Sequence, residues 1–354
     1  MHLIVIAESE LSEVGYPLDY QIMDLVLHCA NIDDLIIHII SDHPSTDIKD
    51  FSSTKNQITL LTIMEAKIGI NQYQDAIVVH FGKLLSWLKA FPHYFVPISL
   101  PNKMIGISII RRYFLNKKFK KWSKTATKVI SFNDWSLQSI IANYPHYNTS
   151  ILSLHLPLME PPLMEWTEMS ATKDGLTNGH NYILIFASVE KITSILKEFS
   201  IFKKWQQSTM HLVFILAHNQ VMDKANSILK GYKFKQDVSI HTIQEVNAAW
   251  LAASYLTIFE SASYANGYFV MNSINYGVPL LMDDQIQLPD NWKSAGEVFS
   301  FAEKNVLSNH FKLYYKDEVY RQSRAKIGTE WLQKLNQERS SFELFNNIVL
   351  SHIK

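Results

Sequence analysis

A segment in the C-terminal half of the chain contains one complete strand–helix–strand unit. Residues 256–284 read LTIFESASYANGYFVMNSINYGVPLLMDD. The apolar, β-branched run Leu256–Phe259 predicts a buried strand, and Phe269–Tyr276 has the spacing of a helix of about two turns. Gly277 is the residue type that ends a helix, and Pro279 opens the next apolar run. This order of elements is typical of a parallel α/β sheet.

Similar units recur along the whole chain. Short apolar runs without strict alternation suit parallel strands that are buried on both faces. The predicted strands are Leu3–Ala7, Leu35–Ile40, Ile58–Ile63, Ala76–Phe81, Phe95–Leu100, Val129–Phe132, Ile151–Leu156, Tyr182–Ala187, His211–Ala217, Val238–Thr242, Leu256–Phe259, Pro279–Met282 and Val298–Phe301. The predicted helices include Pro17–Ala30, Leu84–Phe91, Trp135–Asn143, Ile192–Gln206, Val221–Gly231 and Val246–Ser254. We therefore predict an α/β protein of two Rossmann-like domains.

The composition changes between residues 157 and 181, where prolines and glycines gather and the apolar periodicity is lost. We interpret this stretch as a linker plus a loop. The prediction is an N-terminal Rossmann-like domain over 1–160, a linker over 161–180, a second Rossmann-like domain over 181–330 and a closing helix over 331–354. Ligands of open α/β sheets bind outside the carboxyl ends of the strands, so the expected site is the cleft between two such domains.

The composition excludes several classes of protein. The 354 residues include 33 basic and 33 acidic ones, so the net charge gives no general attraction for nucleic acid. The only cysteine, Cys29, excludes an intrachain disulfide and a cysteine-rich zinc site, and suits a reducing compartment. The motifs GxGxxG, GxxxxGK[ST] and HExxH are absent. We find no signal sequence and no apolar run of membrane-spanning length, so we expect a cytoplasmic protein.

Asn266 and Gly267 precede the predicted helix over 269–276. Asparagine is a preferred N-cap residue, and glycine lets a ligand approach the backbone closely. The free N–H groups at such a helix start bind phosphate without a side-chain charge. An ordinary turn explains the same Asn-Gly pair equally well, and both interpretations stay open on these physical grounds.

This segment resembles the donor-site motif of glycosyltransferase family four, whose members are retaining enzymes with the two-domain GT-B fold. The family pattern is Ser-x-x-Glu-Gly-Phe-Gly, a helix with a second glutamate, Gly-x-Pro, then Leu-Pro-Glu and a later glycine step. The chain matches this frame at Ser261, Gly267, Gly277, Pro279, Leu288, Pro289 and Gly296. Further stretches that resemble the family are Tyr182–Lys191, Ile195–Trp205, Lys128–Ser139 and the C-terminal helix, which in the family crosses back to the N-domain. The resemblance is strong over 181–350 and weak over 1–100.

The chain departs from the family pattern at the charged positions. Tyr264 and Asn272 stand where the family has its two motif glutamates. The second glutamate holds the nucleotide ribose in the family, and Asn272 offers a neutral hydrogen bond in its place. The step that grips the donor diphosphate is shortened, so that Lys191 is its remaining cation and Glu190 beside it repels phosphate.

The resemblance implies a nucleotide-diphosphate sugar as co-substrate, no separate cofactor, no metal, and a glycan or lipid-linked glycan as acceptor. The donor-binding residues it implies are Lys191, Asn266, Gly267, Tyr268, Asn272 and, at the base, Ile243. The chain has no Asp-x-Asp motif, and we interpret Asp283-Asp284 as solvated loop residues rather than metal ligands.

Two residues are candidates for the acceptor side. The glycine-rich loop of the family is reduced here to Gly15. His80 ends a predicted strand at the expected cleft edge, where it either contacts the acceptor or is a buried core histidine. Trp292 follows a loop near the expected donor site and is a candidate for stacking on a ligand.

The stretch Lys103–Lys128 contains nine basic residues with apolar and aromatic residues between them. It predicts either contact with an anionic membrane surface, which makes the protein membrane-peripheral, or a solvated helix whose aromatics face the core. Nucleic-acid binding has no supporting motif.

The function predicted from the resemblance is a glycosyltransferase of polysaccharide biosynthesis. The alternatives are a catalytically degenerate relative that acts as a scaffold, as the second function, and a sugar-nucleotide 2-epimerase, as the third. The missing glutamates favour the second function and count against the third.

Overall fold

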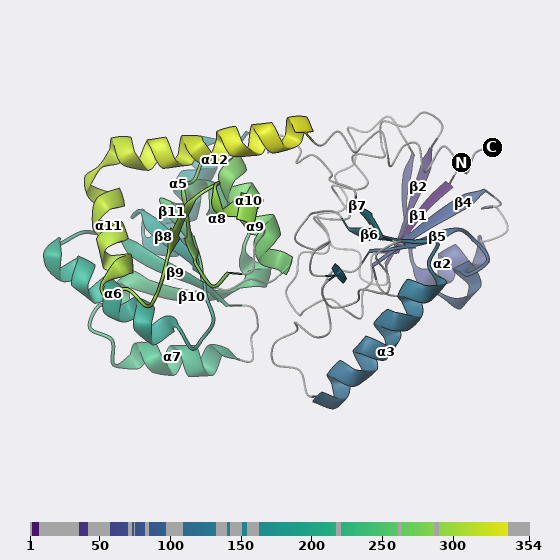
Figure 1. Ribbon diagram of the computed structural model, residues 1–354, viewed down its shortest axis with the longest axis horizontal. Coiled ribbons are helices and arrows are strands. Elements are labelled where there is room, and N and C mark those ends of the chain that lie inside the picture. The colour runs from purple at the N-terminus through teal and green to yellow at the C-terminus, as the bar shows by residue number, and fades with distance from the viewer. Residues whose placement is uncertain are drawn as a thin grey trace. The chain divides into compact units, whose positions relative to one another are not determined.

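The structure is a computed structural model, and it describes residues 2–6, 35–41, 57–69, 73, 75–81, 85–96, 109–131, 140–141, 151–153, 163–216, 221–260, 264–286 and 290–338. The chain divides into two compact units. The first comprises Met1–Glu13, Pro17–Met159 and Glu338–Lys354, and the second comprises Val14–Tyr16 and Glu160–Gln337. Each unit contains one parallel sheet, drawn in purple to blue for the first and in teal to green for the second (Figure 1).

The first unit is built on a seven-stranded parallel sheet in the order β3-β2-β1-β4-β5-β6-β7. Its strands are β1 (His2–Ile6), β2 (Ile36–Ile40), β3 (Ile58–Leu61), β4 (Ala76–His80), β5 (His93–Phe95), β6 (Lys128–Ser131) and β7 (Ile151–Ser153). Its described helices are α2 (Ile63–Ile68), the 3₁₀ turn η3 (Ser86–Leu88) and α3 (Ile109–Thr125). The central strands β1 and β4 are almost wholly buried, which explains why their sequences are apolar without alternation.

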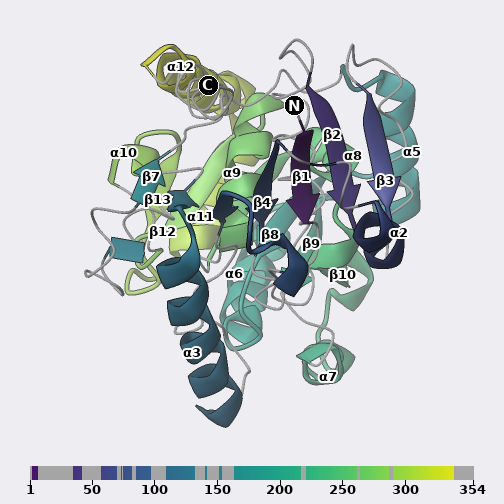
Figure 2. The same ribbon diagram turned by 90° about the vertical axis from the view of Figure 1, so that its right-hand side faces the viewer.

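The second unit is built on a six-stranded parallel sheet in the order β10-β9-β8-β11-β12-β13. Its strands are β8 (Tyr182–Phe186), β9 (His211–Leu216), β10 (Val238–Thr242), β11 (Leu256–Phe259), β12 (Leu280–Asp283) and β13 (Glu297–Phe299). Its helices are α5 (Trp166–Thr177), α6 (Ile192–Trp205), α7 (Met222–Lys230), α8 (Ala248–Ala253), α9 (Tyr264–Asn275), α10 (Asp290–Lys293), α11 (Val306–Lys316) and α12 (Glu318–Glu338), with 3₁₀ turns η6 (Lys235–Asp237) and η7 (Ile243–Glu245). The turned view in Figure 2 separates several of these helices from the strands.

Helix α6 shows how the sequence directs this packing. Its buried residues include Ile195, Phe199 and Phe202, which recur at helical spacing and form one apolar face. Phe199 and Phe202 both contact Phe311 of α11 edge to face, at ring-centre distances of 6.2 and 6.0 Å. The core of the second unit is therefore held by aromatic side chains between α6, α11 and the sheet.

Each of the thirteen predicted strands overlaps an observed strand, and in the described parts the ends of twelve agree within three residues. The exception is β5, which covers His93–Phe95 and shares only Phe95 with the predicted strand Phe95–Leu100. The helical elements differ more. The predicted helix over 84–91 is only the 3₁₀ turn η3, and the stretch interpreted as a linker contains the helix α5. Helix α5 ends at Asn178, whose positive φ of 51° closes it, and it packs against α8. Its mixed composition hid this helix because tertiary packing, rather than apolar periodicity, stabilises it.

Among the described residues, no helix combines the length and the apolar content needed to cross a membrane.

Candidate functional site

The sheet of the second unit reverses its strand order between β8 and β11. From β8 the chain proceeds through α6 to β9 on one side, whereas β11 lies on the other side of β8. Connections that leave in opposite directions open a crevice outside the carboxyl ends of the two strands, and ligands of α/β sheets bind there. The residues that follow β8, β11, β12 and β13 lie at this carboxyl edge of the sheet.

Ser188 and Glu260 meet at this switch point. The Glu260 carboxylate accepts hydrogen bonds from the backbone N–H of Ser188 at 2.7 Å and from its hydroxyl at 3.0 Å. Glu260 is only 9% exposed. Burial raises the pKa of Glu260, although the hydrogen bonds from Ser188 and the positive charge of Lys191 act in the opposite direction. A buried carboxylate thus fixes the loop that follows β8.

A second buried carboxylate, Asp283, ends the neighbouring strand β12 and is 2% exposed. Its Oδ1 accepts a hydrogen bond from the backbone N–H of Gln285 at 3.0 Å. Burial is the largest cause that raises the pKa of Asp283 to about 6, and Lys191 again lowers it. The interpretation of Asp283 as a solvated loop residue is therefore wrong, because the end of β12 is covered by neighbouring elements.

Lys191 is the cation between these carboxylates. It is half-buried, it precedes α6, and it interacts electrostatically with both Glu260 and Asp283. Its Nζ lies 4.3 Å from the ring centre of Phe301, a cation–π contact with the segment after β13. Glu190 beside it is exposed and forms an ion pair of 3.5 Å with Lys224. Lys191 therefore presents the positive charge of this edge, with Glu190 turned to another partner.

Helix α9 starts four residues after Glu260, at Tyr264. The interpretation of Asn266 as the N-cap is thus wrong, because Asn266 and Gly267 already lie in the first turn of the helix. The Asn-Gly pair predicts a turn, but Phe269 and Val270 are buried and hold α9 on the sheet. Phe269 stacks on Phe186 at 4.9 Å.

Phe186 in turn stacks on Phe259 at 4.7 Å, so α9 is docked directly on the ends of β8 and β11. The backbone N–H groups of its first turn consequently lie close in the chain to Glu260, at the carboxyl edge of the sheet. Binding of a phosphate at this helix start stays a prediction. Gly277 ends the helix as predicted, with a φ of +69° that favours glycine.

The remaining donor-side residues occupy separate places in the second unit. Asn272 is half-buried in the last turns of α9, and its carbonyl accepts from the N–H of Tyr276 at 3.0 Å. Ile243 follows β10 and is buried, so a ligand there meets its backbone. Thr242 and Glu245 fix this turn, since the Thr242 N–H and hydroxyl donate to Glu245 at 2.8 and 2.9 Å. The side chain of Tyr268 lies outside the described residues.

On the acceptor side, His80 ends β4 in the first unit and is fully buried. It stacks on Phe95 at 5.3 Å, and its two ring nitrogens have no hydrogen-bond partner among the described residues. Burial, with a smaller effect of His93, lowers the pKa of His80 to about 3, so the ring is neutral near pH 7. Contact between His80 and an acceptor stays a prediction. Gly15 lies outside the described residues.

Trp292 is not available for stacking on a ligand. It is fully buried, and it packs edge to face on Trp331 of α12 at 5.8 Å. No local pattern in the sequence indicated this contact, because the partner lies 39 positions away. In the described part of the chain, no group of three or more His, Cys, Asp or Glu side chains is arranged to hold a metal ion.

No known protein family and no curated protein matches this chain by sequence. Solved structures do match it. The Anabaena protein HepE, in complex with UDP and glucose, is similar with a TM-score of 0.67 and 12% identity, over 100% of this chain and 99% of that one. A glycosyltransferase from Rickettsia africae has a TM-score of 0.65 and 11% identity, over 100% and 98% of the chains. WaaG, a glycosyltransferase involved in lipopolysaccharide biosynthesis, has a TM-score of 0.62 and 10% identity, over 99% of each chain.

This chain has the GT-B fold. The likeness covers both Rossmann-like units, so the fold predicted from the sequence is confirmed. At these identities the likeness establishes the GT-B fold alone. The arrangement of Ser188, Lys191, Glu260 and Asp283 at the carboxyl edge is taken from the structure of this chain and not from the likeness to those proteins.

Proposed function

We propose that this protein is a glycosyltransferase that transfers a sugar from a nucleotide-diphosphate sugar to a glycan or lipid-linked acceptor, in polysaccharide biosynthesis. The fold and the carboxyl-edge site of the second unit support this function. HepE, which has a similar fold, was solved with UDP-glucose as well as with UDP and glucose.

The observation that carries the proposal is the position of Lys191. Its ammonium lies at the topological switch point, beside two buried carboxylates whose pKa values are raised by burial. The positive charge of Lys191 lowers the pKa of both carboxylates, and its side chain is half-buried rather than enclosed. The start of α9 adds backbone N–H groups at the same edge.

These groups suit the chemistry of a retaining transfer without a metal. Departure of the nucleotide diphosphate develops negative charge on its phosphates, and the sugar becomes oxocarbenium-like. Lys191 and the first turn of α9 stabilise the leaving diphosphate, and Asn272 donates a hydrogen bond to a ribose hydroxyl. Loss of one preorganised contact of this kind typically lowers a rate by about 10²–10³-fold.

The first experiment is a thermal-shift titration with UDP, GDP, ADP and their sugars. A Kd of about 100 μM at 1 mM ligand stabilises the folded protein by about 1.4 kcal/mol, which is a measurable shift. A response to one base supports the donor site and directs the search for an acceptor. Silence across the panel with a folded protein contradicts it.

Lys191→Met tests the site itself, with Lys197→Met as the control. Both lysines belong to the start and the first turns of α6, but Lys197 is exposed on the side of the helix. We expect Lys191→Met to weaken binding of the nucleotide sugar about tenfold or more, as for a lost charge-assisted hydrogen bond. Equal affinity of the two variants contradicts the assignment.

A catalytically degenerate scaffold is the second candidate function. Tyr264 and Asn272 replace the two glutamates of the motif that the sequence resembles, and this favours it. The two candidates differ in turnover. If the protein binds a nucleotide sugar but does not transfer the sugar, and hydrolyses it no faster than the uncatalysed reaction, it is a scaffold.

We further propose that α3 places the protein on an anionic membrane surface on the cytoplasmic side. Phe119 of α3 is buried and packs on Phe95 at 5.4 Å, so part of the helix belongs to the core. The other end exposes four large apolar side chains: Ile109 (83%), Ile110 (71%), Tyr113 (66%) and Phe114 (57%). Exposed lysines follow on the same helix. Apolar and basic side chains together suit the interface of an anionic bilayer.

A further inference from the structure

We propose that the second unit has another small-molecule site, at the amino edge of its sheet, and that this site takes an organic anion: a phosphate ester or a carboxylate on a body the size of a sugar ring. The site is separate from the carboxyl-edge site of the proposed function, and it lies entirely within residues 166–321.

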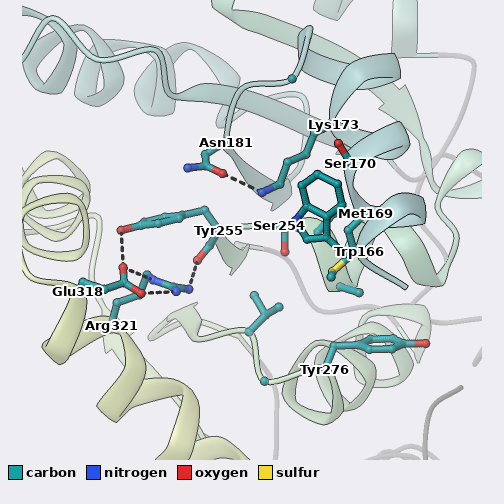
Figure 3. A pocket seen from close by; sticks show the side chains of 15 residues that line it. Trp166, Met169, Ser170, Lys173, Asn181, Ser254, Tyr255, Tyr276, Glu318 and Arg321 are labelled. Atoms are coloured by element: carbon teal, nitrogen blue, oxygen red, sulfur yellow. Dashed lines mark hydrogen bonds and ion pairs between the residues drawn. The ribbon is translucent and has the colours of Figure 1, made fainter. Parts of the chain in front are cut away.

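A cavity of about 620 Å³ defines this site. Asn181, Tyr255 and Val278 line it, and they lie just before β8, β11 and β12. Strands in a parallel sheet all start at the same edge, so the cavity lies at the amino edge, opposite to Ser188 and Glu260. Its remaining walls come from α5, the end of α8, the end of α9 and the start of α12 (Figure 3).

Helix α5 contributes one continuous face to the cavity. Trp166, Met169, Ser170 and Lys173 follow the spacing i, i+3, i+4, i+7, which places them on one side of a helix. Figure 3 shows these side chains on one wall, with Arg321 extending from α12 on another. The segment interpreted from sequence as a linker therefore supplies a wall of a built cavity.

The cavity contains one carboxylate, Glu318, among its lining residues, and Arg321 already uses it. The Arg321 Nε and Nη2 donate to the two oxygens of Glu318 at 2.9 and 2.6 Å. Gln322 donates to the same carboxylate at 3.0 Å, and the Tyr255 hydroxyl approaches it at 3.4 Å. Three N–H donors, two from Arg321 and one from Gln322, therefore bind the carboxylate of Glu318, whereas the Tyr255 hydroxyl donates to the carbonyl of Tyr314 at 2.9 Å.

Lys173 is the second cation of the cavity, and its hydrogen-bond partner Asn181 does not neutralise it. Its Nζ donates to the amide oxygen of Asn181 at 2.8 Å, which is a neutral partner. Burial lowers the pKa of Lys173, and the positive charge of Arg321 lowers it further. An anion in the cavity relieves this repulsion and gains charge-assisted hydrogen bonds from the ammonium.

The size and the walls of the cavity select the rest of the ligand. Its volume falls within the range of small-molecule sites and far exceeds that of a single phosphate. Trp166, Met169 and Tyr276 offer apolar surface, whereas Ser170 and Asn181 offer hydrogen bonds. A hydroxylated ring with one anionic group matches both features.

The test is calorimetric titration of the full chain with glucose 6-phosphate, glucuronate, glucose and inorganic phosphate. We expect both anionic sugars to bind, and glucose and phosphate alone to bind at least about tenfold more weakly. The stronger of the two anionic sugars identifies the preferred anionic group. Equal affinity for inorganic phosphate overturns the inference of an organic ligand.

Two variants locate the binding. Lys173→Met removes the charge at nearly constant shape, and Ser170→Phe fills the cavity while it keeps every charge. Each variant should weaken the binding of glucose 6-phosphate and of glucuronate about tenfold or more. Substitution of an exposed lysine of α12, Lys326→Met, should leave both affinities unchanged. If Lys173→Met does not fold by circular dichroism, Ser170→Phe still decides the question.

The proposal is overturned if neither anionic sugar binds below about 10 mM, or if binding survives in both variants. Its failure is distinguishable from failure of the donor site. Ser170→Phe should leave nucleotide-sugar binding unchanged, and Lys191→Met should leave glucuronate binding unchanged.

Discussion

Ser188 and Glu260 are separated by 72 positions in the chain, yet the Glu260 carboxylate accepts hydrogen bonds from both the N–H and the hydroxyl of Ser188. Ser188 in turn accepts a hydrogen bond from the N–H of Lys191 on its carbonyl, at 3.1 Å. One buried carboxylate thereby fixes the turn that presents the cation of the carboxyl edge. If the resemblance places Tyr264 and Asn272 at the motif glutamates correctly, Glu260 is a carboxylate from a neighbouring position.

Substitution of Glu260 separates its positioning role from its charge. Glu260→Ala leaves the Ser188 N–H without its partner, and we expect a loss of about 1–3 kcal/mol in the free energy of unfolding. Nucleotide-sugar affinity should fall about tenfold, because the turn before Lys191 loosens. Glu260→Gln keeps one acceptor oxygen and removes the negative charge, so affinity should be equal or higher. Chemical denaturation and calorimetry measure both effects, and weaker binding by Glu260→Gln than by Glu260→Ala contradicts the positioning role.

Asp283 should make the stability of the protein depend on pH. Its pKa is raised to about 6 in the folded state, from 3.8. The contribution of Asp283 to the stability of the folded state is therefore fully present below pH 3.8 and is lost as the pH rises through about 6. Asp283→Asn, which keeps the acceptor for the Gln285 N–H, should raise the free energy of unfolding at pH 8 by about 1–3 kcal/mol and have no effect below pH 4. Urea denaturation at the two pH values measures this difference.

The matched control is Asp284→Asn. Asp284 has a lowered pKa, chiefly through a hydrogen bond from Ser300, so its loss should lower stability at pH 8. The same sign of change for both variants would argue against the burial of the Asp283 charge.

Glu297 should change the pH dependence of stability in the direction opposite to that of Asp283. Burial alone raises its pKa, but His310 at 3.5 Å, hydrogen bonds from Tyr320 and Tyr314, and Arg324 outweigh it and lower the pKa of Glu297 to about 2. The Tyr314 hydroxyl and Arg324 Nη2 lie 2.8 and 2.9 Å from its oxygens. The stability from Glu297 is therefore present above pH 4.5 and is lost as the pH falls through about 2.

Glu297→Gln should consequently lower the free energy of unfolding by about 2–3 kcal/mol at pH 7, and by progressively less on acidification. Denaturation midpoints at several pH values provide the measurement, with the exposed Glu330→Gln as control. A pH-independent loss indicates that packing, not charge, is what Glu297 supplies.

The membrane proposal predicts sedimentation with anionic vesicles. Exchange of Lys117, Lys118, Lys120 and Lys121 for glutamine should reduce the bound fraction at least about tenfold, since each basic residue near such a surface contributes about 1 kcal/mol. Exchange of Ile110, Tyr113 and Phe114 for serine should also reduce it, because these exposed side chains would enter the interface.

The control for charge alone exchanges four exposed lysines of the second unit, Lys197, Lys204, Lys230 and Lys235, for glutamine. If the two sets of lysine exchanges reduce binding to anionic vesicles equally, α3 has no specific role in that binding. Unchanged binding to neutral vesicles is expected in both lysine variants, since the lysines act through the surface charge of the bilayer.

The sequence by itself determined the strands and the class of fold. Buried strands such as β4 and β8 are runs of mainly apolar residues. This pattern is local, so the strands can be predicted without knowledge of the tertiary structure. Gly277 likewise ends α9 where its residue type predicted, because a positive φ favours glycine. The repeated strand–helix order was then sufficient to predict two Rossmann-like units.

Only the tertiary structure decided which polar residues come together. Trp292 is in the core because Trp331 of α12, 39 positions away, packs on it, and no local pattern encodes that contact. The burial of Asp283 at the end of β12 likewise has no local signal. Helix α5 exists because it packs on α8, and α9 begins at Tyr264 because Phe269 docks on Phe186, against the turn preference of Asn-Gly. Local propensities are small compared with the free energy of burying such side chains, so the site belongs to the packed chain rather than to its motifs.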